Sequence, residues 1–115
     1  MSNVFNFSKP NNSISLVIEG KEYETISIDT QVIDIVNNFA KACTREAEKL
    51  KDGDLTKLKD STKVLVDFVD NILGEEARIE ILGKEANWFR SYELCLFLIN
   101  MIQEKFTNIV NKYVK

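Results

Sequence analysis

The chain has 115 residues, of which 44% are hydrophobic and 29% are charged, and its formal net charge is −3 at pH 7. That length suits one domain, spanning residues 1–115, whose single core needs no disulfide or metal. The composition is typical of globular proteins rather than of disordered ones. Because phosphate binding requires an excess of Lys and Arg on one face, the acidic balance argues against a nucleic-acid partner.

The first segment, residues 1–13, is expected to be a loose arm, since Pro10 and the two asparagines after it interrupt regular structure. This arm is polar and short, and no apolar run of about 18 residues follows it anywhere in the chain. We therefore expect neither a signal peptide nor a membrane span. The expected location is the cytoplasm.

Residues 14–28 predict a β-hairpin, because apolar and polar side chains alternate along both halves of the segment. Gly20 and Lys21 are expected to form a type II′ turn, which needs glycine in its first position. That turn would place Leu16 opposite Thr25. A two-stranded hairpin is marginally stable alone, so it should pack on the rest of the chain.

Residues 30–114 predict a small bundle of three to four helices. Asp29 or Thr30 can cap the first helix, which should end at Gly53. Its apolar positions recur at helical spacing and define one face, made of Val32, Val36, Phe39, Ala40, Cys43, Ala47 and Leu50.

Asp54 is the expected cap of a second helix, which Gly74 should end. Glu75–Leu82 is expected to be a short third helix bounded by Gly83. The alternation of apolar and charged residues over 77–82 leaves a strand open as an alternative.

The last helix carries the strongest periodic signal in the sequence. Large residues recur at alternating spacings of four and three, and we expect most of this stripe to be core, with a coiled-coil seam as the alternative. The stripe consists of Trp88, Tyr92, Cys95, Ile99, Ile102, Phe106, Ile109 and Tyr113.

A second apolar set on the same helix, Leu94, Phe97 and Met101, is expected to face almost away from that stripe. A monomer usually places polar residues on such a back face. Three explanations stay open: the helix is packed between other elements, another chain covers the set, or the set is apolar surface that the protein tolerates. We take these three residues as the candidate partner-binding site.

No catalytic chemistry is apparent in the sequence. The chain has no histidine, and its four glycines are scattered rather than gathered in a phosphate-binding loop. Cys43 and Cys95 are too few for a zinc site and are expected to be buried thiols. We therefore expect no enzyme activity, no cofactor and no metal.

Two segments resemble a known family. The hairpin sequence from Leu16 to Glu24, with its Gly-Lys-Glu-Tyr turn, resembles the opening of small tail assembly chaperones from long-tailed phages and prophages of Gram-positive bacteria. The stretch Ile72–Ala77, followed by Ile81-Leu82-Gly83, is similar to a pattern in small phage tail proteins. The arm before the hairpin is a departure from that family, because the family's hairpin lies at the very start.

The predicted hairpin and helices together indicate an α+β fold, with an N-terminal β-hairpin followed by a helical bundle that ends in one long helix. The resemblance implies the host cytoplasm as the location if a phage encodes the chain. It also implies a chaperone that covers the apolar helical tape measure protein until tail tube subunits assemble around it, and self-association. Two alternatives are a structural tail or virion component and a small helical regulator that binds a host protein.

Overall fold

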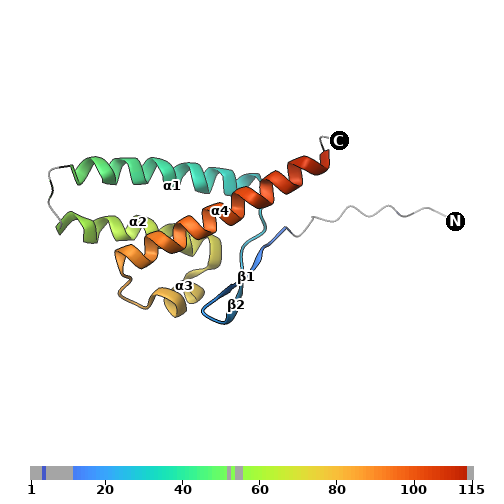
Figure 1. Cartoon of the computed structure of the whole chain (residues 1–115). Helices are drawn as coiled ribbons and strands as arrows, with labels where there is room; N and C mark the ends of the chain where they lie inside the picture. The colour runs from blue at the N-terminus through green and yellow to red at the C-terminus, as the bar shows by residue number, and fades with distance from the viewer. Residues whose placement is uncertain (1–3, 5–11, 52, 54–55, 114–115) are drawn as a thin grey trace.

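The computed structural model describes residues 4, 12–51, 53 and 56–113. Over these residues a two-stranded antiparallel hairpin precedes four helices, the last of them long, which confirms the expected α+β fold (Figure 1). Most of the predicted arm and the predicted helix cap at Asp54 lie outside the described residues.

The hairpin consists of β1 (Ser15–Ile18) and β2 (Lys21–Glu24), with Leu16 opposite Tyr23. The predicted turn and register are therefore wrong. The turn residues are Glu19 and Gly20, and both have positive φ angles, 51° and 80°. Positive φ at both positions is the signature of a type I′ turn, which matches the twist of the strands. The observed register differs from the predicted one by two residues, since Leu16 lies opposite Tyr23 rather than Thr25. Because this difference is an even number, each side chain keeps its inward or outward direction.

The hairpin is fastened to the helices beyond its second strand. The backbone N–H of Thr25 donates to the Ile14 carbonyl at 3.0 Å, and the Ile14 N–H donates to the Thr25 hydroxyl at 2.9 Å. The Ile26 N–H then donates to the carbonyl of Ile72, at the end of the second helix, at 2.9 Å. Leu16 is buried in the core. The sheet thus gains the support that a two-stranded hairpin lacks alone.

The first helix, α1 (Thr30–Lys49), begins at the predicted cap, where Asp29 accepts a hydrogen bond from the backbone N–H of the second helical residue. It packs on α2 (Thr56–Leu73), and the rings of Phe39 and Phe68 stack with centroids 4.3 Å apart. The predicted apolar face of α1 is only partly covered, because Val32 is its single fully buried residue.

The third element, α3 (Glu75–Leu82), is a helix, so the alternative of a strand over 77–82 is wrong. Gly74 connects it to α2 with a φ of 92°, a conformation that suits glycine. The side chains of Arg78 and Asp70 form an ion pair with a nitrogen–oxygen distance of 2.8 Å, which ties α3 back to α2.

The last helix, α4 (Trp88–Tyr113), packs mainly against α2. Its buried residues are Ser91, Leu94, Cys95, Leu98 and Ile102. At 100° per residue, this buried face is rotated by roughly 50° from the predicted stripe. The rotation leaves Tyr92 41% exposed. Tyr113 is 84% exposed because it is the last residue of α4, about three turns beyond the last buried residue.

Ser91 lies in the middle of the buried face of α4 and is completely buried. Its hydroxyl donates to the carbonyl of Asn87 in the preceding turn, at 2.7 Å. A buried hydroxyl that is satisfied by its own helix carries little cost. A polar residue can therefore occupy this face beside Leu94 and Leu98, which belong to the core.

Candidate partner-binding surfaces

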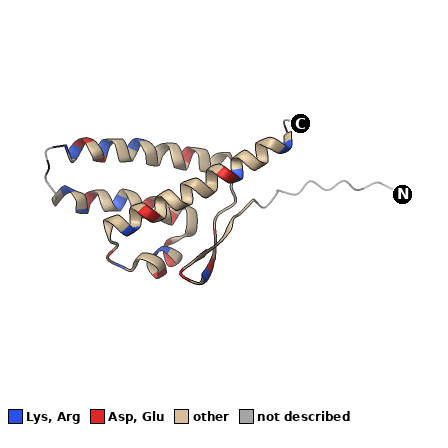
Figure 2. Ribbon diagram, in the orientation of Figure 1, with Lys and Arg blue, Asp and Glu red and all other residues tan. Residues whose placement is uncertain are grey.

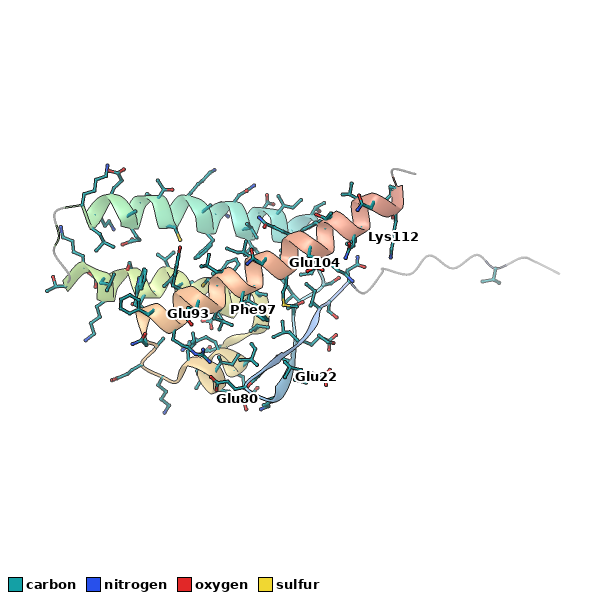
Figure 3. The ribbon with its side chains drawn as sticks, in the orientation of Figure 1. Glu22, Glu80, Glu93, Phe97, Glu104 and Lys112 are labelled. Atoms are coloured by element: carbon teal, nitrogen blue, oxygen red, sulfur yellow. The ribbon has the colours of Figure 1, made fainter. Side chains whose placement is uncertain are left out.

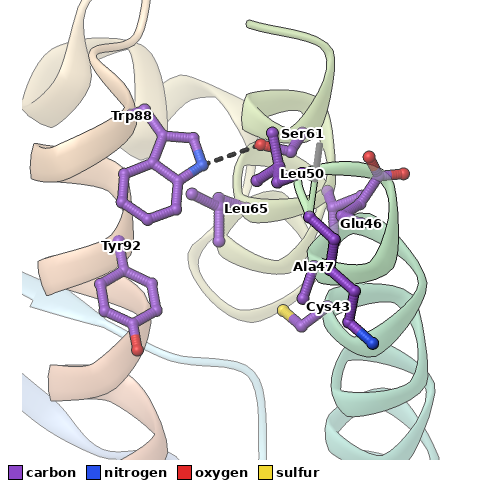
Figure 4. Close-up of a pocket in the computed structure, with 10 residues that line it drawn as sticks. Cys43, Glu46, Ala47, Leu50, Ser61, Leu65, Trp88 and Tyr92 are labelled. Atoms are coloured by element: carbon purple, nitrogen blue, oxygen red, sulfur yellow. Dashed lines mark hydrogen bonds between the residues drawn. The ribbon is translucent and has the colours of Figure 1, made fainter. Parts of the chain in front are cut away.

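A cleft of about 480 Å³ lies between α1 and the first turns of α4, with α2 as its floor (Figure 4). Both α1 and α4 pack on α2, but they contact each other much less. The opening between them, called the α1–α4 cleft below, is lined by Cys43, Glu46, Ala47, Leu50, Lys51, Ser61, Val64, Leu65, Trp88 and Tyr92.

Three of the polar groups in the cleft have partners. The indole N–H of Trp88 donates to the Ser61 hydroxyl at 2.9 Å, and that hydroxyl donates to the Leu58 carbonyl at 2.8 Å. The carboxylate of Glu46 pairs with Lys49 at 3.2 Å. Because these groups are already paired, an apolar group placed beside them would not leave them without a partner.

A smaller hollow of about 100 Å³ continues between α1 and α4 toward the N-terminal end of α1. Ile33 and Val36 line it on the α1 side, and Ile99 and Phe106 line it on the α4 side. Measured along α1 from Ile33 to Lys49, where the helix ends, the two hollows together follow about 24 Å of helix at 1.5 Å per residue.

The two cysteines differ in their relation to the cleft. Cys43 is half-buried and lines the cleft, whereas Cys95 is fully buried and its thiol donates to the Leu65 carbonyl at 3.4 Å. Burial raises the pKa of the Cys43 thiol, and Glu46 raises it further. Burial also raises the pKa of Cys95 to about 12. The expectation of a buried thiol thus holds fully for Cys95 and only in part for Cys43.

The side of α4 next to the cleft is unusually apolar for an exposed surface. Phe89 is 64% exposed, Leu96 43% and Val110 52%. The Trp88 ring stacks on Tyr92, with centroids 5.1 Å apart, and forms an edge contact with Phe89 at 5.2 Å. Sequence reasoning missed Phe89, Leu96 and Val110, although they follow the same spacing of three and four, because it assigned the buried face to the neighbouring stripe.

The three residues predicted to contact a partner do not form one surface. Leu94 belongs to the core and Met101 is partly buried against it, as expected for a helix packed on more than one side. Phe97 is 42% exposed, midway along α4 (Figure 3). It lines a separate pocket of about 350 Å³, together with the exposed Val17 of the hairpin. A contact between these residues and a partner stays a prediction.

Acidic and basic side chains are mixed along the helices rather than gathered into a face of one sign (Figure 2). In the part of the chain that the structure describes, no cluster of three or more potential metal ligands is present. Over the same residues, no helix combines the length and the apolar composition needed to cross a membrane. The apolar surfaces around α4 are therefore the strongest candidates for a functional site.

Comparison with family models, with curated proteins and with solved structures gives no match to this chain.

Proposed function

We propose that this protein is a non-enzymatic binding factor that holds the apolar face of a partner helix in the α1–α4 cleft. The observation that carries the proposal is the cleft itself, which is lined mostly by apolar side chains and in which the Trp88 indole, the Ser61 hydroxyl and the Glu46 carboxylate are already paired. The resemblance of the hairpin and of the Leu-Gly-Glu segment to tail assembly chaperones supports the same reading. In that role the partner would be the tape measure protein, whose apolar helices need cover before the tail tube forms.

A helix fits the cleft better than an extended peptide does. Peptides that bind as strands pair with the open edge of a sheet, whereas helical peptides lay an apolar face into a groove. All three walls of this cleft are helices, whose backbone groups are hydrogen-bonded within each helix. A bound helix would satisfy its own backbone and present only side chains, at positions such as i, i+3, i+4 and i+7.

Trp88 provides a direct test, because it lines the cleft and is the only tryptophan in the chain. A synthetic amphipathic peptide of about five helical turns, with its leucines along one face, should change the fluorescence of Trp88, and the change should saturate as more peptide is added. The same peptide should slow the reaction of Cys43 with a thiol reagent. A peptide of identical composition with scrambled leucine positions should do neither.

A pair of matched variants localises the binding. Ala47→Glu places a charge on the wall of the cleft, and Thr44→Glu places the same charge on an exposed position of α1 outside it. Burying an unpaired carboxylate is costly, so Ala47→Glu should weaken binding at least ~10-fold, or about 1.4 kcal/mol. Thr44→Glu should bind within about 2-fold of wild type. Equal binding by both variants, or equal binding of the scrambled peptide, would contradict the proposal.

The chaperone role needs a separate test with a natural partner. Co-expression with a long, apolar, helical tape measure protein should increase the soluble fraction of that protein, and Ala47→Glu should abolish the increase. If the peptide binds in the cleft but the tape measure protein stays insoluble, the cleft binds helices and the chaperone assignment is wrong.

A further inference from the structure

The side of α4 that faces α1 and the solvent carries a long heptad pattern, in which Ile99 and Phe106 are partly buried and line the hollow beside α1. Eight positions between Phe89 and Tyr113 alternate in spacing between three and four residues, and Gln103 is the single polar residue among them. A coiled-coil helix shows this 3–4 spacing where it faces another helix. These positions, called the outer stripe below, are Phe89, Tyr92, Leu96, Ile99, Gln103, Phe106, Val110 and Tyr113.

The outer stripe exposes enough apolar surface for a specific interface. Phe89, Tyr92, Leu96, Val110 and Tyr113 are between 41% and 84% exposed, and Ile33 of α1, which lies beside the stripe, is 44% exposed. At roughly 150–250 Å² for a large side chain, these fractions amount to about 600 Å² on one copy. A pair of copies would then bury about 1,200 Å², which exceeds the ~1,000 Å² expected of a biological interface.

The position of α4 in the fold favours an antiparallel pair. Ile102 is the last fully buried residue of the helix, and the turns after it extend beyond α1, away from the hairpin and α3 (Figure 1). Antiparallel pairing would set the body of each copy beside the extending end of the other. A parallel pair would bring both bodies to the same end. Opposed helix dipoles also favour the antiparallel arrangement.

The register of such a pair follows from the spacing. With the twofold axis near residue 101, Phe89 faces Tyr113 of the second copy and Leu96 faces Phe106. Large residues thus lie in every outer layer of the seam. Glu93 lies on the solvent-exposed edge of the outer stripe, directly after Tyr92, and would face the neutral Thr107 of the second copy. No like charges meet along that flank, so the register carries no electrostatic penalty there.

We propose that α4 pairs antiparallel with α4 of a second copy through the outer stripe. The inference goes beyond the binding of a partner helix. The outer stripe has Tyr92 in common with the α1–α4 cleft, and it has Ile99, Gln103 and Phe106 in common with the smaller hollow. Ala47 lines the cleft and is not part of the outer stripe, whereas Leu96 belongs to the stripe and lines neither hollow. Substitutions at these two residues therefore disrupt one surface each.

Disulfide cross-linking tests both the contact and its direction. In a Cys43→Ser background, Phe89→Cys protein is mixed with Tyr113→Cys protein and oxidised mildly. The mixture should give a disulfide-linked dimer. Each variant alone should give at least about 10-fold less of that dimer, because in an antiparallel pair residue 89 of one copy lies about 36 Å from residue 89 of the other, at 1.5 Å per residue, and the same holds for residue 113. If each variant alone cross-links as well as the mixture, the antiparallel arrangement is overturned. If no combination cross-links, the contact itself is overturned.

The mass in solution gives an independent result. Sedimentation of wild type should show twice the 13.2 kDa of one chain at tens of micromolar. Leu96→Glu should shift the mass to that of the single chain, while Asn108→Glu, an exposed substitution on another side of α4, should leave the dimer intact. Far-UV circular dichroism should be unchanged in both. A wild type that stays at 13.2 kDa would overturn the proposal, as would a Leu96→Glu variant that keeps the dimer mass.

Discussion

Two leucines on α4 allow a matched test of which face of this helix is core. Leu98 is 1% exposed, whereas Leu96, two residues earlier on the same helix, is 43% exposed. Replacing leucine by alanine removes three carbon atoms, about 2.4 kcal/mol at ~0.8 kcal/mol for each buried methylene. With a cavity term added, Leu98→Ala should lower the free energy of unfolding by about 3–4 kcal/mol. Leu96→Ala should lower it by about 1 kcal/mol, since roughly half of that transfer term applies.

The assay is urea denaturation of the two variants beside wild type, followed by circular dichroism at low micromolar concentration, where a dimer contributes least. A loss of 3–4 kcal/mol is a large share of the ~5–15 kcal/mol that holds a typical domain together. It should lower the melting temperature by more than about 10 °C. If Leu96→Ala is as destabilising as Leu98→Ala, the helix face described above is incorrect.

Three further predictions follow from the same contacts. A thiol reagent should label Cys43 in the native protein, whereas Cys95 should react only after unfolding. Labelling of Cys43 should be faster at alkaline pH, because only the thiolate reacts and burial raises the pKa of the Cys43 thiol. Two thiols that label at equal rates in the native protein would be inconsistent with this geometry. Thr25→Val should destabilise the fold by about 1–3 kcal/mol, measured by denaturation, because the Ile14 N–H loses its acceptor; a Thr25→Ser variant, which keeps the hydroxyl, should lose less. Gly74→Ala should cost about 1–3 kcal/mol because its φ of 92° suits only glycine; an unchanged melting temperature would show that the junction relaxes.

Much of the fold could be predicted from local features of the sequence. The capping carboxylate at Asp29 and the glycines at 74 and 83 mark element boundaries, because they satisfy or terminate helical backbone groups wherever the chain folds. Gly53 does not mark the end of α1 in this way, because that helix already ends at Lys49. The alternation around Leu16 likewise predicts a strand. The hairpin register was not predictable from glycine alone, since Glu19 accepts a positive φ and moves the turn by one residue.

The faces of α4 were decided only by tertiary packing. Apolar residues surround so much of this helix that periodicity allows several neighbouring stripes to be core. In the folded chain the polar Ser91 and Leu94 are buried, and Tyr92 lies at the edge of the cleft. The cleft itself depends on the angle between α1 and α4, which meet at one end and diverge at the other. That angle is set by how both helices pack on α2, a relation among three distant segments that no local pattern encodes.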